Sequence, residues 1–199
     1  MPAPLPLHAP RHAIVRPRAQ RRADVALGVL EMRPHRRAGP LRVPRPDGVE
    51  DRRVVSAVHK ERERIAHGVD IIANGLKKGG RLFLVGAGTS GRLGILEAAE
   101  MPLTFGTTPK LVRAIMAGGQ DAVFHQREGA EDNFEEGARS VARLRVSKRD
   151  VIIGVSASGL TQFVRGALTG ARKKAARIIF VTCWPGTELQ NYVDLIIAP

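Results

Sequence analysis

The strongest constraint on the fold is an alternation, beginning near Val54, between short apolar runs and longer amphipathic stretches. Each apolar run has the length of one strand and no polar face, which is typical of strands buried on both sides of a parallel sheet. The runs occupy residues 81–88, 111–117, 151–157, 177–183 and 194–199. Because helical stretches separate most successive runs, the sequence predicts an α/β fold with a doubly wound sheet of about five parallel strands.

The helical stretches are recognised by apolar residues that recur on one face. Residues 54–78 predict a single helix that ends at Gly79 and Gly80. Its apolar positions are Val58, Ile65, Val69, Ile72 and Leu76. Residues 159–176 predict another helix, with one apolar face formed by Phe163, Val164, Ala167, Leu168 and Ala171. Two more helices are expected over residues 89–101 and 128–145.

The first 50 residues have a different composition, with ten Arg, no Lys, no aromatic residue and nine of the thirteen prolines. Frequent proline prevents long helices and central strands, and the few apolar residues cannot build a core. We therefore expect residues 1–52 to form a disordered basic segment and residues 53–199 to form the folded domain. Four interpretations of the segment stay open: an RNA-binding arm, an organelle transit peptide, a solvated tail without function, or a stretch that is not native coding sequence.

Composition excludes several classes of protein. No apolar run approaches 18 residues, so no transmembrane helix and no membrane partner are predicted. A single cysteine, Cys183, cannot form an internal disulfide, which favours the cytosol, and it also argues against a zinc cluster. The net charge of +13 would suit nucleic acid, but the N-terminal arginines are not interleaved with aromatic residues, so no specific nucleic-acid partner is predicted.

Two turns rich in glycine and hydroxyl side chains follow two of the predicted strands. Ligands of such sheets bind beyond the carboxyl ends of the strands, where the amides of a following helix can face an anion. The candidate phosphate-binding residues are Gly88, Thr89, Ser90, Gly91 and Arg92 in the first turn and Ser156, Ser158, Gly159 and Thr161 in the second. Glycine lets the backbone approach the anion, and the hydroxyl groups can donate to its oxygens.

The first turn differs from the known nucleotide fingerprints. Gly86, Gly88 and Gly91 match the G-x-G-x-x-G spacing, but no convincing acid-ended strand follows about 20 residues later, as dinucleotide binding requires. The turn also lacks the lysine of a triphosphate-binding loop. A phosphate monoester is the better candidate ligand.

Residues 79–106, 117–133 and 151–164 together resemble the sugar isomerase (SIS) domain of the N-acetylmuramic acid 6-phosphate etherase family, whose relatives include the glucokinase regulatory protein. The resemblance extends over about residues 54–199. It implies a sheet of SIS (flavodoxin-like) type. It also implies a carbon–oxygen lyase of amino sugar catabolism and cell-wall recycling, which cleaves the D-lactyl ether of N-acetylmuramic acid 6-phosphate to N-acetylglucosamine 6-phosphate and D-lactate. No metal or organic cofactor, a homodimer and a cytoplasmic location are further implications.

By position, the resemblance places the two functional carboxylates of the family on Glu100 and Glu131. The chemistry also requires two such groups, because a base must remove the proton beside the carbonyl of the opened sugar and an acid must protonate the departing lactate oxygen. Two carboxyls can divide these tasks if their environments separate their pKa values. Glu100 is expected to be the main acid–base residue and Glu131 its assistant, although the reverse order stays open.

The sequence departs from the family pattern beside these sites. Ala99 stands where Ser is common, Met101 and Leu103 flank Pro102 where Cys-Pro-Pro is common, and residues 160–162 replace Arg-Thr-Pro. The family also continues beyond the position of Pro199, so we expect a domain truncated at its C-terminus. These features keep two alternatives open: a non-catalytic regulatory protein that binds sugar phosphates, and an inactive fragment of the family.

Overall fold

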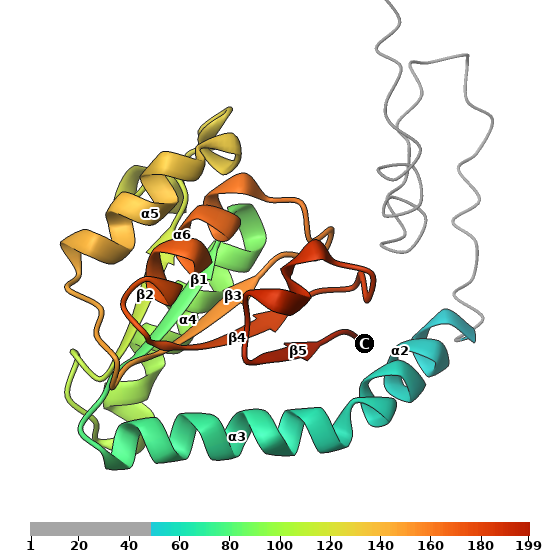
Figure 1. The fold of residues 1–199 in the computed structure, drawn as a ribbon. Helices are drawn as coiled ribbons and strands as arrows, with labels where there is room; N and C mark the ends of the chain where they lie inside the picture. The colour runs from blue at the N-terminus through green and yellow to red at the C-terminus, as the bar shows by residue number, and fades with distance from the viewer. Residues whose placement is uncertain (1–48) are drawn as a thin grey trace, which may run out of the picture. The chain divides into compact units, whose positions relative to one another are not determined.

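The computed structural model describes residues 49–199, which lie within one of the two units of the chain, Arg37–Pro199. The expectation of a disordered segment over residues 1–52 falls outside the described residues except at residues 49–52, which form the first turn of a helix. The predicted parallel sheet is confirmed (Figure 1). Its five strands run parallel in the order β2-β1-β3-β4-β5. They are β1 (Leu82–Gly86), β2 (Val112–Met116), β3 (Val151–Val155), β4 (Arg177–Val181) and β5 (Leu195–Ile197).

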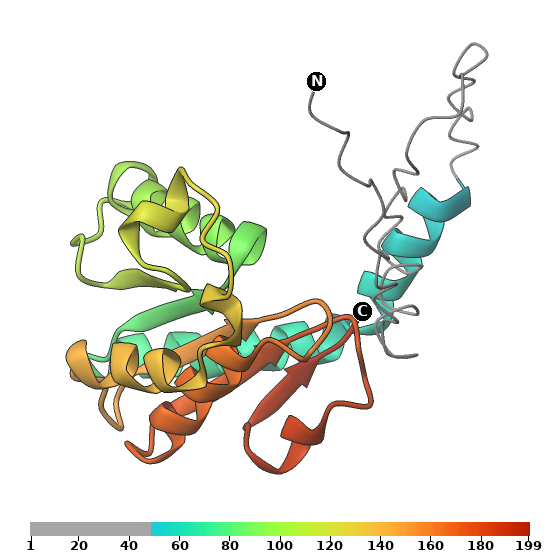
Figure 2. The same ribbon diagram turned by 90° about the horizontal axis from the view of Figure 1, so that it is seen from above.

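Helices cover both faces of this sheet, as a doubly wound fold requires. The helices are α2 (Val49–Lys60), α3 (Arg62–Lys77), α4 (Gly88–Phe105), α5 (Phe134–Arg143) and α6 (Gln162–Arg172), with short 3₁₀ turns η1 (Gln120–Val123), η2 (Ala130–Asp132) and η3 (Glu188–Asn191). Glycines of α3 and α4 approach side chains of one face, whereas Gly154 of β3 approaches α6 on the other. Figure 2 shows α4 on one side of the strands and α5 and α6 on the opposite side. Within residues 49–199, no helix is both long enough and apolar enough to cross a membrane.

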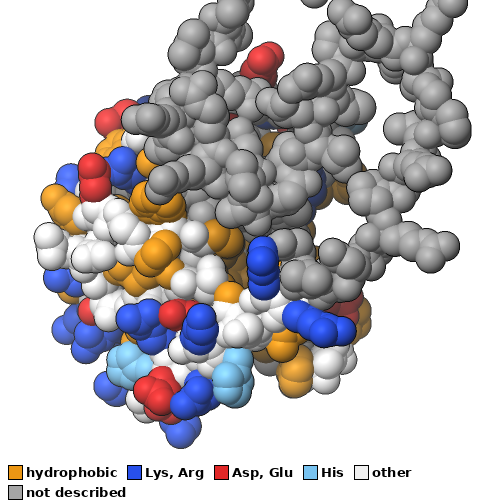
Figure 3. Space-filling view, turned by 90° about the vertical axis from the view of Figure 1, so that its right-hand side faces the viewer, with side chains coloured by type: hydrophobic (Ala, Val, Ile, Leu, Met, Phe, Trp, Pro, Cys, Tyr) orange, Lys and Arg blue, Asp and Glu red, His pale blue; other side chains and the backbone are white. Residues whose placement is uncertain are grey.

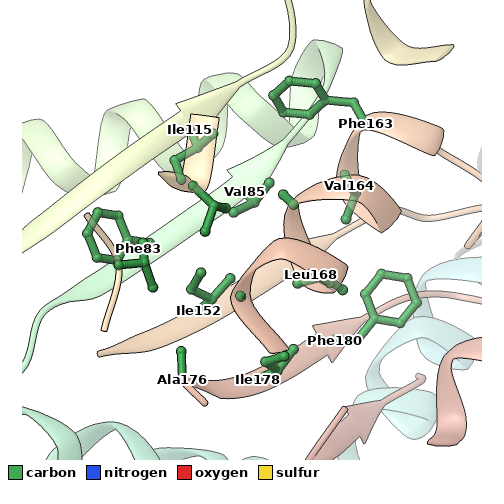
Figure 4. Packing of buried hydrophobic residues seen from close by; sticks show 14 of the residues in the cluster. Phe83, Val85, Ile115, Ile152, Phe163, Val164, Leu168, Ala176, Ile178 and Phe180 are labelled. Atoms are coloured by element: carbon green, nitrogen blue, oxygen red, sulfur yellow. The ribbon is translucent and has the colours of Figure 1, made fainter. Parts of the chain in front are cut away.

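The main core lies between the sheet and the α5–α6 layer. Figure 4 shows side chains of β1, β3 and β4 packed with those of α6. The apolar face predicted for the helix over residues 159–176 is confirmed, because all five of its members are at most 1% exposed. Burying one such side chain contributes roughly 1.5 to 3 kcal/mol, so this face fixes how α6 lies on the sheet.

Three predicted helix boundaries were wrong. The helix expected over residues 54–78 is two helices, and Val58 and Val69 of its expected apolar face are 44% and 58% exposed. The break at Glu61 is explained by its carboxylate, which is buried, pairs with Arg64 and accepts a hydrogen bond from the amide of Ala198. Such a contact between distant parts of the chain leaves no periodic signal in the sequence.

The other two boundaries involve the regions that carry the candidate glutamates. Helix α4 continues through Pro102 to Phe105. The helix expected from residue 128 begins only at Phe134, where the side chain of Asn133 caps it by accepting from the amide of Glu136. Glu131 therefore lies on the preceding turn η2 and not in the first turn of an α-helix.

The amino edge of the sheet, where the strands begin, is held by a buried carboxylate. Asp150 is 2% exposed and accepts two hydrogen bonds from the Arg81 guanidinium, at 3.1 and 2.8 Å. It also accepts from the backbone amides of Arg81 and Ser147. Burial alone would raise the pKa of Asp150, but the hydrogen bonds from Arg81 and Ser147 outweigh it and lower the pKa. The segment before β3 is thereby fixed to the start of β1.

Candidate functional site

A pocket of about 440 Å³ lies at the carboxyl ends of β1 and β2. The turn after β1 and the loop after β2 form its walls, so the pocket lies at the edge where ligands of doubly wound sheets bind. The lining residues are Ala87, Gly88, Thr89, Arg92, Met116, Ala117, Ala122, Gln126, Arg127, Glu128, Gly129, Ala130 and Glu131. Four of the predicted site residues, Gly88, Thr89, Arg92 and Glu131, are thus brought together.

The first turn has its shape because two glycines let strand and helix approach closely. A Cβ on Gly86 would lie 2.6 Å from the amide nitrogen of Gly91, and a Cβ on Gly91 would lie 2.7 Å from Cγ of Met116. Because of this close approach, α4 begins directly at Gly88, two residues after β1 ends. Because the first amides of a helix have no partner within it, the amides beside Thr89 form a suitable position for an anion. Gly91 therefore shapes the turn and does not line the pocket.

Arg92 helps to build the pocket wall. Its Nε donates to the carbonyl of Val123 at 2.8 Å, and one terminal nitrogen donates to the carbonyl of Ala122 at 2.9 Å. These bonds fasten turn η1 to helix α4. Arg92 thus holds the loop after β2 in place, while its charge remains beside the pocket.

The second turn is closed by its own hydrogen bonds. The hydroxyl of Ser156, which is 4% exposed, lies 2.8 Å from the hydroxyl of Thr161. Ser158 Oγ accepts from the amide of Leu160, and Gly159 has a left-handed φ of 72°. None of Ser156, Ser158, Gly159 and Thr161 lines the pocket, and neither does Ser90 of the first turn. Their assignment to phosphate binding stays a prediction.

A third turn, which sequence reasoning missed, completes the pocket. Gly118 and Gly119 follow β2 with φ values of 77° and 70°, and they direct the chain into the loop that carries Gln126 to Glu131. Arg127 of this loop lines the pocket and pairs with Asp121 at 2.7 Å. Adjacent glycines at the end of a predicted strand were the available signal.

The two candidate glutamates lie in different environments. Glu131 is exposed on η2 and lines the pocket. Glu100 is exposed on α4 and does not line it. Leu93, Leu96 and Leu103 share the helix face of Glu100, at spacings of three and four residues, and are 56%, 55% and 84% exposed. The structure therefore places one glutamate in the pocket and the other within an exposed apolar surface.

The chemical character of the pocket is mixed. Arg92 and Arg127 supply positive charge, and Glu128 and Glu131 supply carboxylates. Within residues 49–199, no group of three His, Cys, Asp or Glu side chains is arranged to hold a metal ion. Helix amides, a hydroxyl, two guanidinium groups and a carboxylate are suited to bind a phosphorylated molecule and to move a proton on it.

Known sequences similar to this chain are SIS-domain proteins and etherases. The family described as the glucokinase regulatory protein N-terminal SIS domain matches residues 64–172. An N-acetylmuramic acid 6-phosphate etherase of Symbiobacterium thermophilum is 50% identical over 150 residues, which are 75% of this chain and 50% of that protein. The etherase of Trichodesmium erythraeum is 45% identical over 73% of this chain and 48% of its own length. The chain thus spans about half the length of these curated relatives.

Comparison with solved structures concerns the fold. A phosphoheptose isomerase of Neisseria gonorrhoeae superposes with a TM-score of 0.57 at 19% identity, covering 74% of this chain and 78% of the isomerase. A phosphoheptose isomerase of Francisella tularensis gives a TM-score of 0.56, also at 19% identity and with the same coverage. The chain therefore shares the overall fold of these two isomerases.

Proposed function

Since this chain belongs to the SIS-domain family that includes the N-acetylmuramic acid 6-phosphate etherases and the glucokinase regulatory protein, we propose that it acts as a lyase on the lactyl ether of N-acetylmuramic acid 6-phosphate. The products are N-acetylglucosamine 6-phosphate and D-lactate. The observation that carries the proposal is the identity of 45 to 50% with etherases over the part of the chain that builds the pocket. A cytoplasmic role in amino sugar catabolism belongs to the same proposal.

The reaction requires an elimination followed by the addition of water. A base removes the proton on the carbon beside the carbonyl of the opened sugar, and the ether carbon–oxygen bond breaks as a double bond forms. The departing lactate oxygen takes a proton from an acid. Because the product carries a hydroxyl where the ether was, one water then adds across the double bond. The same pair of carboxyls can serve both halves of the reaction.

We assign the phosphate to the first turn, with the second turn as a further binding element. Thr89 and the amides at the start of α4 line the pocket, and Arg92 and Arg127 offset the negative charge of the phosphate. Ser156, Ser158, Gly159 and Thr161 would contribute from the neighbouring strand β3 after their internal hydrogen bonds open. The first turn therefore contributes most of the affinity in this proposal.

Glu131 and Glu100 are proposed as the two carboxyls, and a homodimer brings them together. Glu131 already lines the pocket of its own protomer. Glu100 lies among exposed leucines of α4, and a second copy of the chain that covers this surface would place Glu100 against the partner's site. Burial of Leu93, Leu96 and Leu103 would stabilise such a dimer by roughly 25 cal/mol for each Å² of apolar area removed from water.

The catalytic test measures D-lactate released from N-acetylmuramic acid 6-phosphate by the 199-residue chain. Glu100→Gln keeps the shape of the side chain but removes its acid–base function, so the rate should fall by about 10²- to 10⁴-fold while sugar-phosphate binding persists. Glu131→Gln should also lower the rate. The matched control is Glu135→Gln, an exposed glutamate of α5, which should leave the rate unchanged. Binding of the sugar phosphate without lactate release by the unaltered chain would instead support a regulatory protein or an inactive fragment of the family.

The dimer is tested separately by sedimentation velocity. Leu96→Glu together with Leu103→Glu should convert a dimer to a monomer, because each buried leucine becomes a charge without a partner. Val69→Glu on α3 is the control, since Val69 is similarly exposed but lies on another helix. A protein that is monomeric before any substitution would contradict this part of the proposal.

A further inference from the structure

A second pocket lies at the amino edge of the sheet, opposite the edge that carries the candidate site. Its volume is about 520 Å³. It is bounded by α3 from His67 to its C-terminal end, the segment before β3, the first residue of β4 and the residue before β5. The lining residues are His67, Ile71, Asn74, Gly75, Lys78, Lys148, Arg149, Arg177 and Asp194.

The charges around this pocket do not balance. Asp194 is its single carboxylate, and that group is already engaged by the Arg177 guanidinium at 3.0 Å and by the amide of Ile178 at 2.7 Å. Within residues 49–199, no acidic side chain lies within ion-pairing distance of Lys78, Lys148 or Arg149. Three cations therefore face the pocket without a carboxylate to offset them.

The exposed surface of α2 and the start of α3 carries charges of both signs. The lower part of the face in Figure 3 shows Lys, Arg and His side chains with Asp and Glu side chains among them. Arg64 there pairs with Glu61 at 2.8 Å, and Arg62 pairs with Glu63 at 3.4 Å. That surface is a solvated face with mixed charge, whereas in the second pocket four cationic side chains surround one carboxylate in a concave space.

The backbone that carries these cations is fixed in position. A Cβ on Gly75 would lie 2.5 Å from Cγ2 of Val151, and a Cβ on Gly80 would lie 1.9 Å from the carbonyl oxygen of Arg149. The end of α3 is thus packed directly against the segment before β3. Asp150, between Arg149 and the strand, is held by Arg81 and Ser147. The backbone segments that carry the exposed cations are therefore held together before an anion binds, so only the side chains need to be ordered.

We propose that this pocket binds a small anion that carries two or more phosphate groups. Three cations from two segments can contact separate phosphate oxygens, and a single phosphate would leave part of this charge unpaired. The concave shape and the volume suit a small molecule. Within the described residues the pocket is lined by no Phe, Tyr or Trp side chain, and these are the rings on which single-stranded nucleic acid stacks. The site is separate from the proposed sugar-phosphate site.

Calorimetric titration of the full chain with inorganic pyrophosphate tests the proposal. Lys148→Ala together with Arg149→Ala should weaken binding by about 100-fold, since each charge-assisted bond is worth roughly a factor of ten. Lys78→Ala, from another element, should weaken it by about tenfold. Neither change removes a side-chain hydrogen bond present in the described structure, so folding should be retained.

Two controls separate this site from general charge and from the first pocket. Lys173→Ala with Lys174→Ala removes the same charge at the end of α6, on the other face of the sheet, and should leave pyrophosphate binding unchanged. A saturating concentration of N-acetylglucosamine 6-phosphate, which would occupy the first pocket, should also leave pyrophosphate binding to the second pocket unchanged. An equal loss in either control, or the absence of saturable binding, would overturn the proposal. Tighter binding of a single-stranded oligonucleotide than of pyrophosphate would overturn the choice of a small molecule.

Discussion

The two edges of the sheet are stabilised by different interactions. At the amino edge, the buried carboxylate of Asp150 joins the starts of β1 and β3, and Asp194 joins β4 to β5 through Ile178 and Arg177. At the carboxyl edge, the turns after β1 and β3 depend on glycine and on hydroxyl groups. The contrast indicates that the hydrogen-bonded carboxylates of the amino edge maintain the fold, while the first turn of the carboxyl edge keeps polar groups available for a ligand.

The largest effect is expected from removing the central carboxylate of the amino edge. Asp150→Ala removes the carboxylate partner of the Arg81 guanidinium, which keeps only the carbonyls of Leu144 and Arg145, and it leaves two backbone amides without their acceptor. Breaking a buried pair in this way costs about 3 kcal/mol of unfolding free energy. Urea denaturation followed by circular dichroism measures the loss. Asp132→Ala, which removes an exposed carboxylate, should change stability by less than about 0.5 kcal/mol. Equal stability of the two variants would contradict the contrast.

The first turn of the carboxyl edge should respond in binding and not in folding. Thr89→Val with Ser90→Ala removes two hydroxyls of the first turn but leaves Gly86 and Gly91 in place. Affinity for a sugar 6-phosphate should fall by about 2 kcal/mol, or roughly 30-fold, in calorimetry. The urea midpoint should stay unchanged, because Thr89 is exposed and its hydroxyl has no partner in the described structure. A shift of the urea midpoint with unchanged affinity would show that these hydroxyls stabilise the fold and do not bind the ligand.

The strands and the α6 face could be predicted because each depends on residues that are close in sequence. The two-helix arrangement of α2 and α3 could not, because Glu61 is buried through a contact with Ala198 at the other end of the folded region. Helix α4 also continues through Pro102, against the local preference of proline. At Glu61, a contact between distant segments therefore overrode the local signal.

The candidate site was predicted in part for the same reason. Gly88 and Thr89 follow an obvious strand and line the pocket. The role of Arg92 in holding η1 depends on carbonyls about 30 residues away, which no local pattern specifies. The position of Glu100 outside the pocket follows from the direction of α4 on the sheet, and periodicity does not give that direction.

The pH dependence of unfolding tests whether the Asp150 carboxylate stabilises the amino edge, with a smaller expected effect. The pKa of Asp150 is lower in the folded protein than its ordinary value. Its contribution to stability is therefore complete above the unfolded pKa of about 3.9 and is lost as the pH falls through the lower folded pKa. The difference in unfolding free energy between the wild type and Asp150→Asn should be constant near neutral pH and should narrow below about pH 4.

Comparing the two proteins removes the contributions of other groups. Glu136 also has a lowered pKa, caused first by its hydrogen bond from Arg143, and it titrates equally in both proteins. A difference that widens in acid would show that the Asp150 carboxylate does not stabilise the fold. The measurement is urea denaturation at a series of pH values.

The smallest expected effect comes from replacing Ser156, because this removes only one hydrogen bond. Ser156 combines the position of the carboxyl edge with burial like that of the amino-edge carboxylate Asp150. Its hydroxyl lies on the carboxyl edge but is buried and bonded to Thr161. Ser156→Ala should therefore cost about 1 kcal/mol of unfolding free energy, the usual value of one buried hydrogen bond. Thr161→Val should cost a similar amount, and the double variant should cost little more, since both single changes remove the same bond. Urea denaturation of the three variants gives the coupling free energy. Additive costs would show that the two hydroxyls act separately, which would leave Ser156 free to serve as a ligand and make the second turn equivalent to the first.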